Sequence, residues 1–326
     1  MSIAHRFSFA LTLVCAGLTA NTAALAQDGS AYPAKPIRII VPFPAGGTTD
    51  LVARMVQPKF QEFLGVQTII ENKGGAGGSI GANEAARSAP DGYTYLMVFD
   101  THATNHHIYK DALDPFKNLE HLMLMVTSPS TLVAVPNFAP SNLKDLIARA
   151  KQEPGRMTYA SVGSASSNHL GILQLEQAAG IRMTHIPYKG GGPLIQALLG
   201  QQVDISFVST PLILPHLKSG KVKGIATGGT KRLTQMPEIP TLAETFPGME
   251  MVSWFGLLAP NGVPRDITAR VRRDLARAME VPEIRQRLID SGFDIVASSP
   301  EEFLKFVQNE SDKLGKLIRD NGIKVE

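Results

Sequence analysis

The sequence predicts a two-lobed α/β fold in which each lobe is a mainly parallel sheet flanked by helices. From residue 36 onward, short β-branched runs alternate with amphipathic helical patterns. This order is typical of parallel strands with helices on both faces of the sheet. Two longer apolar stretches, 121–136 and 252–259, interrupt the alternation. We expect both to be strands that cross between the lobes and form a hinge.

The two crossings predict a discontinuous first lobe and a continuous second lobe. The first lobe is expected to comprise residues 33–130 together with 253–326, and the second residues 131–252. A chain of 326 residues is long enough for two hydrophobic cores.

Apolar periodicity and glycine or proline boundaries define the elements expected in each lobe. For the first lobe, the patterns predict strands at 36–43, 67–71 and 93–99, and helices at 51–64, 79–87, 265–279, 282–290 and 300–320. For the second lobe, they predict strands at 157–162, 182–187, 203–208 and 222–227, and helices at 141–151, 167–179, 192–200 and 211–218.

Residues 1–26 have the pattern of a secretory signal peptide. A weakly basic start precedes the apolar run 7–20, and Ala24-Leu25-Ala26 provides a small-x-small cleavage site. The run is shorter than the roughly 20 residues that a spanning helix needs. We expect cleavage before Gln27 and a periplasmic location; a retained N-terminal anchor is the alternative. The only cysteine, Cys15, lies in this segment, so the mature chain has no disulfide or thiolate chemistry.

Charge and motifs exclude several classes of function. The formal net charge is only +3, which gives no support for nucleic-acid binding. The nearest approach to a GxSxG elbow, residues 163–167, has Ala165 at the nucleophile position, and neither a Walker loop nor HExxH occurs. The glycine cluster 74–81 departs from the dinucleotide fingerprint at Ile80. We therefore expect no catalytic residues and no cofactor.

Three histidines follow the third predicted strand, at positions 102, 106 and 107. On a helix, His102 and His106 would share a face as metal ligands can. Because no carboxylate accompanies them at helical spacing, a polar surface loop is the favoured interpretation, and no metal site is expected.

Four strand-to-helix junctions are rich in small residues, namely 44–48, 77–79, 161–164 and 189–192. In open α/β sheets, ligands bind beyond the carboxyl ends of the strands, where helices begin with unpaired N–H groups. Such helix starts favour anions. Any single junction is explained better as a tight turn or an N-cap than as a binding loop. Four together predict a carboxylate held by main-chain donors.

Ordered motifs along the mature chain resemble one known family. They are Tyr32-Pro33, the run 36–47 (PIRIIVPFPAGG) with Asp50, the run 71–81 (ENKGGAGGSIG), Pro90-Asp91-Gly92-Tyr93-Thr94, the run 159–164 (YASVGS) with His169, the run 185–191 (HIPYKGG), and Val203-Asp204. In order and spacing they are similar to the substrate-binding proteins of tripartite tricarboxylate transporters, the Bug receptors.

The resemblance implies a type II "Venus flytrap" that closes on a carboxylate. In the family, the loop that matches residues 43–48 holds one carboxylate through backbone groups and waters, and the loop that matches 161–164 takes the distal end. The third-strand loop, Thr101-His102 here, varies and tunes selectivity. The substrate-binding residues expected on these grounds are Phe43, Ala45, Gly46, Gly47, Thr48, Asp50, Ser79, Thr101, His102, Ser161, Gly163, Ser164, His169, Gly190, Gly191 and Thr210. Lys73-Gly74 departs from the family's usual Arg-Pro, a difference that loosens the second turn ahead of Ser79.

The function implied is an extracytoplasmic receptor for a small organic carboxylate: a di- or tricarboxylate, an acidic amino acid or an aromatic acid. It would act as a monomer and deliver its ligand to the subunits of a tripartite tricarboxylate transporter in the membrane. Two alternatives stay open. One is a sensory receptor that presents its closed form to a membrane kinase. The other is an exported hydrolase that uses Ser164 with His169.

Overall fold

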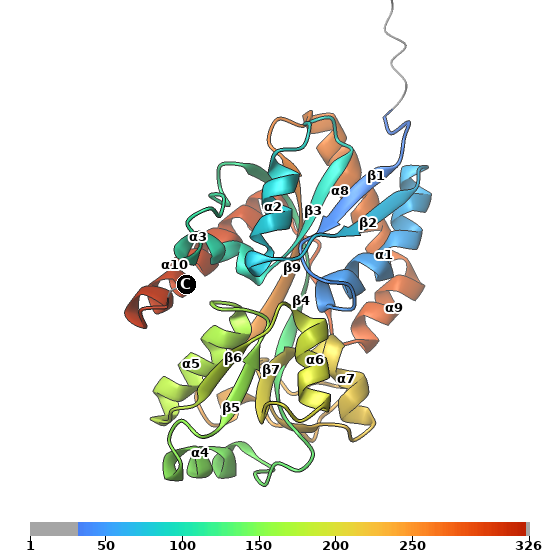
Figure 1. Cartoon of the computed structure of the whole chain (residues 1–326). Helices are drawn as coiled ribbons and strands as arrows, with labels where there is room; N and C mark the ends of the chain where they lie inside the picture. Colours follow the sequence, from blue (N-terminus) through green and yellow to red (C-terminus); the bar gives the residue numbers. More distant parts are fainter. Residues whose placement is uncertain (1–31, 324–326) are drawn as a thin grey trace, which may run out of the picture.

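The computed structural model describes residues 32–323, and these form two lobes joined by two long strands (Figure 1). The predicted signal peptide lies outside the described residues. Strands β4 (Leu119–Ala134) and β9 (Val252–Pro260) run from one lobe into the other, as expected for the two apolar stretches. They pair antiparallel along residues 119–129 of β4.

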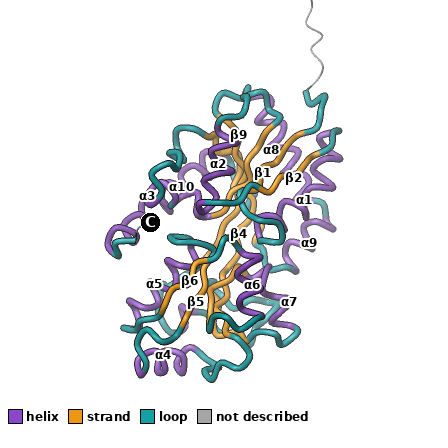
Figure 2. Tube along the Cα trace, viewed as in Figure 1, coloured by secondary structure: helices purple, strands orange, loops and turns teal. Residues whose placement is uncertain are grey.

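The first lobe is built on a parallel three-stranded arrangement. Strand β1 (Ile37–Val41) lies between β2 (Thr68–Asn72) and β3 (Thr94–Phe99). On the other edge of β3, β9 pairs antiparallel, and β4 follows it. The carboxyl ends of β1 and β3 therefore point in the same direction, toward the second lobe, as the arrows in Figure 1 show. Figure 2 shows the same strands in orange along the backbone.

The second lobe repeats this arrangement. Strand β5 (Thr158–Ser161) lies between β6 (Thr184–Pro187) and β7 (Ile205–Ser209), all parallel. The last part of β4 pairs antiparallel with both β7 and β8 (Lys223–Thr227).

The sheets of the two lobes are continuous with each other through β4, one of the two crossing strands. The described strands form a ten-stranded mixed sheet in which β4 belongs to both lobes. Because β4 is 16 residues long, it pairs with β9 in its first part and with β7 and β8 in its second. A short strand, β10 (Asp294–Ile295), also pairs with β4 and is absent from the sequence prediction.

Helices cover both faces of the sheet in each lobe (Figure 1). The first lobe has α1 (Thr48–Leu64), α2 (Ser79–Ala86), the one-turn α3 (Asn105–Ile108), α8 (Arg265–Glu280), α9 (Pro282–Asp290) and α10 (Pro300–Asp320). The second has α4 (Leu143–Gln152), α5 (Ser167–Ala179), α6 (Gly191–Leu199) and α7 (Thr210–Lys218). Short 3₁₀ turns occupy residues 76–78, 100–103 and 242–244.

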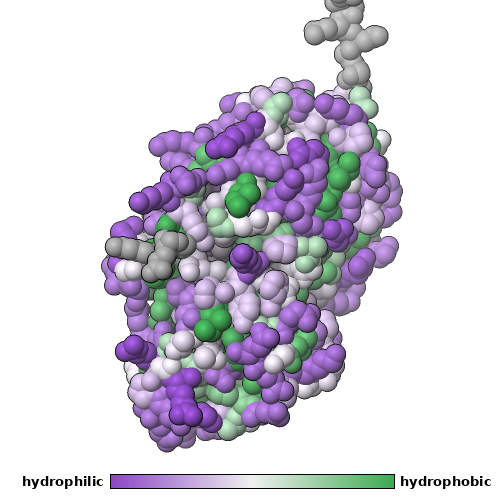
Figure 3. Space-filling model, viewed as in Figure 1, coloured by the Kyte–Doolittle hydropathy of each residue, from purple (hydrophilic) through white to green (hydrophobic). Residues whose placement is uncertain are grey.

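Local sequence explains where several helices begin and end. Helix α1 ends at Gly65, whose φ of 76° is readily available only to glycine and whose N–H bonds Gln61. Helix α10 begins with a capping box between Ser299 and Glu302. The polar faces of such helices make the visible surface largely hydrophilic, with small scattered apolar spots (Figure 3).

Each lobe has its own hydrophobic core. Leu132, Phe207 and Leu198 belong to the second core, whereas Ile37, Phe60 and Phe255 belong to the first. A small separate cluster joins α5 to the C-terminal half of α10 through Leu170 and Leu314. Helix α10 thus packs on both lobes. Within residues 32–323, none of the helices is both long and apolar enough to cross a membrane.

Candidate ligand-binding cleft

Two loops from opposite lobes meet at the centre of the molecule. The loop after β1 leads into α1, and the loop after β6 leads into α6. A Cβ atom on Gly191 would lie 3.5 Å from Cα of Gly47, and one on Gly190 would lie 3.2 Å from Cδ of Pro44. The absence of side chains at Gly47 and Gly191 is what allows the two backbones to approach so closely.

A cavity of about 370 Å³, which includes its open mouth, lies beside this contact. Both lobes line it, with residues that are mostly apolar or uncharged: Phe43, Gly47, Thr48, Thr49 and Phe99 from the first lobe, and Val162, Asn168, Gly191, Val208, Ser209 and Leu212 from the second. Lysine and arginine do not occur among these lining residues of the described chain.

Helix starts converge on the cavity. Thr48 and Thr49 begin α1, Asn168 lies in the first turn of α5, Gly191 begins α6 and Ser209 precedes α7. In the part of the chain that the structure describes, the starts of α1, α6 and α7 have no side-chain cap. Their free N–H groups and the helix dipoles favour a negative charge here without a basic side chain.

Asp50 organises the first loop from behind instead of facing the cavity. Its Oδ2 accepts hydrogen bonds from the Gly46 N–H at 3.0 Å and from Nε of Arg54 at 2.9 Å, and its Oδ1 accepts from Nδ2 of Asn72 at 3.1 Å. Burial opposes ionisation of Asp50, but these hydrogen bonds outweigh it and lower its pKa. The Gly46 N–H is therefore already hydrogen-bonded within the loop. Ala45, the residue before it, is exposed and lies near Gly192 of the other lobe.

The glycine-rich turn before α2 supports the same loop. A Cβ on Gly74 would lie 2.9 Å from Cδ of Pro44, and one on Gly78 would lie 3.3 Å from the Phe43 ring. Ser79 is buried in this turn, and its hydroxyl has no hydrogen-bond partner within residues 32–323. Gly74 thus lets the turn pack closely against the loop that borders the cavity.

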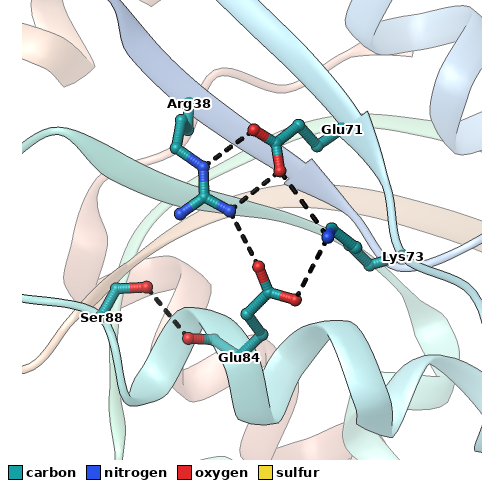
Figure 4. Close-up of polar contacts among 5 residues, drawn as sticks. All are labelled: Arg38, Glu71, Lys73, Glu84 and Ser88. Atoms are coloured by element: carbon teal, nitrogen blue, oxygen red, sulfur yellow. Dashed lines mark hydrogen bonds and ion pairs between the residues drawn. The ribbon is translucent and has the colours of Figure 1, made fainter.

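An ion-pair network holds α2 against the first two strands (Figure 4). Arg38 bonds both carboxylate oxygens of Glu71 at 2.9 Å and bonds Glu84 of α2 at 2.8 Å. Lys73 lies 3.7 Å from Glu84. Because these side chains are about one-third exposed, the network orients α2 more than it stabilises the fold.

The third-strand loop turns its polar side chains inward. Thr101 Oγ1 donates to the Gly77 carbonyl at 2.7 Å. The His102 ring lies 5.7 Å from that of His121, and burial lowers the pKa of His102 to about 3. The expectation of surface histidines is wrong for His102, because the 3₁₀ turn at 100–103 points it into the first lobe. Among the described residues, no group of three or more His, Cys, Asp or Glu could hold a metal.

In the second lobe, the loop after β5 is held by its own side chains. Ser161 Oγ donates to the Gly163 carbonyl at 2.9 Å, accepts from the Gly163 N–H at 3.2 Å and lies 2.7 Å from Nε2 of His185. Gly163 has a φ of 140°, which favours glycine. Val162 of this loop lines the cavity, and Ser164 is half-buried beside it.

His169 is a packed structural histidine. Its Nδ1 accepts a hydrogen bond from the Ala165 N–H at 3.0 Å, and its ring stacks on that of His185 at 3.9 Å. Burial lowers the pKa of His169 to about 3. Its contacts are with Ala165 and His185, so the geometry gives no support to a nucleophile–base pair with Ser164.

Thr210 bonds the strands behind the cavity. Its Oγ1 donates to the Pro129 carbonyl at 2.6 Å and lies 2.8 Å from Oγ1 of Thr131. The neighbours Ser209 and Leu212 line the cavity instead. Of the sixteen residues expected from the sequence, the structure brings Phe43, Gly47, Thr48 and Gly191 to the cavity wall.

Several lining residues escaped the sequence reasoning, although a positional signal existed for some. They are Thr49, Phe99, Val162, Asn168, Val208, Ser209 and Leu212. Phe99 and Ser209 are the last residues of β3 and β7, and Asn168 is the second residue of α5, so all three occupy the edge where ligands bind. The sequence reasoning concentrated on small and polar residues at the strand-to-helix junctions, so it overlooked most of the apolar members.

Beside the cavity lies a buried polar cluster that the sequence did not reveal. Asp100 follows β3 directly, and the N–H of Ser167 in the other lobe lies 3.5 Å from its Oδ1. Ser253 of β9 lies within 3.5 Å of the hydroxyls of Ser130, Ser167 and Ser209. Burial raises the pKa of Asp100 to about 8. This cluster spans both lobes where the crossing strands meet.

Comparison with known proteins places the chain in one family. Residues 52–323 match the family model described as tripartite tricarboxylate transporter family receptor. BugT of Bordetella pertussis is 33% identical over 322 residues, which cover 96% of this chain and 98% of BugT.

Solved structures agree with this assignment and confirm the predicted two-lobed fold. The periplasmic binding protein BugD is 33% identical with a TM-score of 0.86 over 90% of this chain and 100% of BugD. MatC from Rhodopseudomonas palustris, solved with malate, is 30% identical with a TM-score of 0.83 over 88% of this chain and 100% of MatC. A second R. palustris protein, solved with adipate, is 28% identical with a TM-score of 0.87 over 90% of this chain and all of its own.

Receptors of this kind bind solutes without transforming them, which removes the exported hydrolase from the alternatives. The chain belongs to the tripartite tricarboxylate transporter family of receptors, the Bug receptors, and is a solute receptor.

Proposed function

We propose that the chain is a periplasmic receptor that closes its two lobes on a small organic carboxylate and delivers it to a tripartite tricarboxylate-type transporter in the membrane. The observation that carries the proposal is the convergence of uncapped helix starts from both lobes on one cavity. An anion between these starts would interact with helices of both lobes at once, so the acid itself would hold the lobes together.

The lack of basic residues in the wall favours an acid held by main-chain donors. Each helix start stabilises a negative charge by about 0.3–1 kcal/mol when exposed and by more when partly buried. The starts of α1 and α6 lie on opposite lobes, so one carboxylate could bond to both. The relatives solved with malate and with adipate support a carboxylate ligand for this chain.

The two crossing strands would form the hinge between the lobes. We assign residues 33–130 with 253–326 to one lobe and 131–252 to the other, with β4 and β9 as the connection. Two paired strands bend without letting the lobes separate, so opening admits the ligand and closure buries it. Residues 1–26 would direct export and be removed.

Ligand binding is tested by thermal unfolding of the purified chain with a panel of mono-, di- and tricarboxylates at millimolar concentration. A ligand at 100 times its Kd stabilises the folded chain by about 2.7 kcal/mol, so at least one acid should raise the melting temperature clearly. Gly47→Val, which places a branched side chain in the cavity, should abolish the shift. Ala139→Val, at an exposed position outside the cavity, should preserve it. A panel without any shift would contradict carboxylate binding.

Delivery to a transporter is tested separately by uptake of the radiolabelled acid in cells from which the chain has been deleted. Uptake should fall and be restored by the wild-type chain but not by Gly47→Val. Unchanged uptake in the deletion strain would contradict the delivery role while leaving ligand binding intact, and would favour the sensory alternative.

A further inference from the structure

The last helix of the chain reaches from one lobe to the other. The first half of α10 belongs to a core of the first lobe, where Phe303 and Val307 are fully buried. Its second half leaves that core, and Leu314 and Ile318 pack in a separate cluster with Leu170 of α5 in the second lobe. The red end of α10 lies beside α5 at the level where the lobes meet (Figure 1). We call this contact between α5 and α10 the interlobe seam.

The interlobe seam follows both helices for about two turns. Its residues on α5 are 170, 173 and 177, and those on α10 are 314, 318 and 321. At the far end, Nε2 of Gln177 donates to Oδ1 of Asn321 at 2.9 Å. Side chains three, four and seven residues apart share one face of a helix. The two helices therefore run side by side and in the same direction along this face.

A hydrogen bond at the near end of the seam joins the same two lobes. Thr104, directly before α3, donates its hydroxyl to the Ala165 carbonyl at 2.9 Å, and both residues are buried. Ala165 also belongs to the seam cluster. Its φ of 55° is uncommon for a residue with a side chain, and such a conformation persists only where surrounding contacts hold it. The loop before α5 is thus shaped to meet the first lobe.

The second half of α10 is fixed to the first lobe by α3. Nε2 of His107 lies 3.1 Å from both the hydroxyl and the carbonyl oxygen of Ser311. A Cβ on Gly315 would lie 2.5 Å from the same nitrogen, so the ring packs directly on the helix backbone. Ile108 packs against the seam cluster from the same side. When the lobes separate, α10 should therefore stay with the first lobe, and the seam must come apart.

Opening of the cleft would expose apolar side chains that closure buries. Leu170, Leu314 and Ile318 are at most 6% exposed, and they belong to none of the larger cores of the described chain. They are also not among the described residues that line the cavity. Apolar burial favours the state in which it occurs, whatever the cavity holds. Part of the free energy of closure thus comes from contacts that a ligand does not make.

We propose that the second half of α10 is a latch that holds the two lobes closed. It engages Ala165 and Leu170 when the cleft shuts and releases them when it opens, so the chain populates the closed form even without a ligand. The latch raises the affinity for any ligand from outside the cavity, because a larger closed fraction lowers the cost of closing on it. The inference goes beyond the proposed carboxylate function, since it requires no particular ligand.

The test is a distance measurement by pulsed electron paramagnetic resonance on the ligand-free chain, refolded from urea to remove any bound acid. Cys15 is the only native cysteine, so a Cys15→Ser background allows spin labels at Lys151→Cys in α4 and Lys305→Cys in α10, both exposed positions. With an intact seam, the distances should fall into two populations, one of which matches the closed structure. Leu314→Ser should lower the ratio of closed to open chains at least about tenfold, because a large apolar side chain loses its burial.

Further variants separate the latch from a general loss of stability. Val307→Ala, on the same helix but in a core of the first lobe, should lower the melting temperature and leave the closed fraction unchanged. Leu314→Met keeps an apolar side chain of similar volume and should preserve the closed fraction. Ile318→Ala should lower it as Leu314→Ser does. Leu314→Ser with Leu170→Ser should be hardly more open than either alone, because each change removes the same contact.

A chain with an intact seam that is wholly open without ligand would overturn the inference. A closed fraction that neither Leu314→Ser nor Ile318→Ala lowers would do the same. Equal loss of the closed fraction in Val307→Ala and Leu314→Ser would show that α10 acts only through the stability of the first lobe, which also contradicts a latch. Each of these outcomes leaves the acid panel unaffected, so the proposed function is tested independently.

Discussion

Gly47 of the first lobe and Gly191 of the second lie so close that a Cβ on Gly191 would stand 3.5 Å from Cα of Gly47. Gly47 directly precedes α1 and Gly191 is the first residue of α6, and both line the cavity. Closure of the cleft thus depends on two positions without side chains.

Gly191→Val should hinder closure. Its side chain would enter the interface and displace Leu212, since even a Cβ there lies 2.7 Å from Cδ2 of Leu212. We expect ligand affinity to fall by at least about tenfold, the equivalent of roughly 1.4 kcal/mol. Small-angle scattering should show that saturating ligand shrinks the wild type but not the variant. Ligand-induced compaction equal to that of the wild type would contradict this role.

Asp50→Asn should loosen the first loop without touching the ligand. The variant weakens the charge-assisted bonds to Gly46 and Arg54, so we expect a loss of about 1–3 kcal/mol in the free energy of unfolding. Affinity should fall as well, because the loop no longer holds Gly47 in place. Urea unfolding and calorimetry measure the two effects. The exposed Asp290→Asn is the control, and matching behaviour of the two variants would refute the positioning role.

Buried histidines should make the fold sensitive to mild acid. Burial lowers the pKa of His185 and of His121 to about 4 and that of His169 and His102 to about 3, whereas the unfolded value is 6.5. The unfolded chain therefore binds more protons below pH 6.5, and stability is full above this pH and falls as pH drops.

Each histidine contributes at most about 1.4 kcal/mol per pH unit. Urea unfolding at pH 7.5, 6 and 5 should show the decline. A constant free energy of unfolding over this range would mean that the rings are charged or exposed in the folded chain.

The titration of Asp100 should change the stability of the fold with pH in the direction opposite to that of the histidines. Its folded pKa is raised by burial to about 8 from an ordinary value near 3.8, with Glu310 of α10 reinforcing the shift and the Ser167 and Ser253 hydrogen bonds opposing it. The folded chain therefore holds a proton that the unfolded chain releases, so this contribution is present at low pH and is lost as pH rises toward 8.

Comparison with Asp100→Asn isolates the effect. The stability of the wild type relative to the variant should fall between pH 5 and pH 8 by up to about 1.4 kcal/mol per unit. The free energy of unfolding of both proteins by urea is the measurement. A difference that does not change with pH would show that Asp100 is ionised throughout.

Most of the fold could be predicted from the sequence because its signals are local. Apolar periodicity with glycine and proline boundaries placed α5 at 167–179 and α9 at 282–290, the bounds that the structure shows. The two crossing strands also stood out by their length. The sharing of β4 between lobes and its pairing with β10 depend on contacts distant in sequence, which no local pattern records.

The candidate site was predictable where backbone conformation determines it. Glycines at positions 47 and 191 mark close approach, and the structure places both at the cavity. The direction of side chains was harder to predict from the sequence. His102 and Thr210 are close in sequence to residues that line the cleft, yet both side chains point into the fold. The cluster around Asp100 and Ser253 assembles residues 153 positions apart, which only the folded chain brings together.

The most direct test of main-chain recognition is titration of the isotope-labelled chain with its acid, followed by ¹H–¹⁵N correlation spectra. We expect the largest shifts at the amides of Thr48, Thr49 and Gly191, because their N–H groups would bond to the carboxylate. Unmoved signals at these three amides in the presence of saturating ligand would contradict recognition by the helix starts.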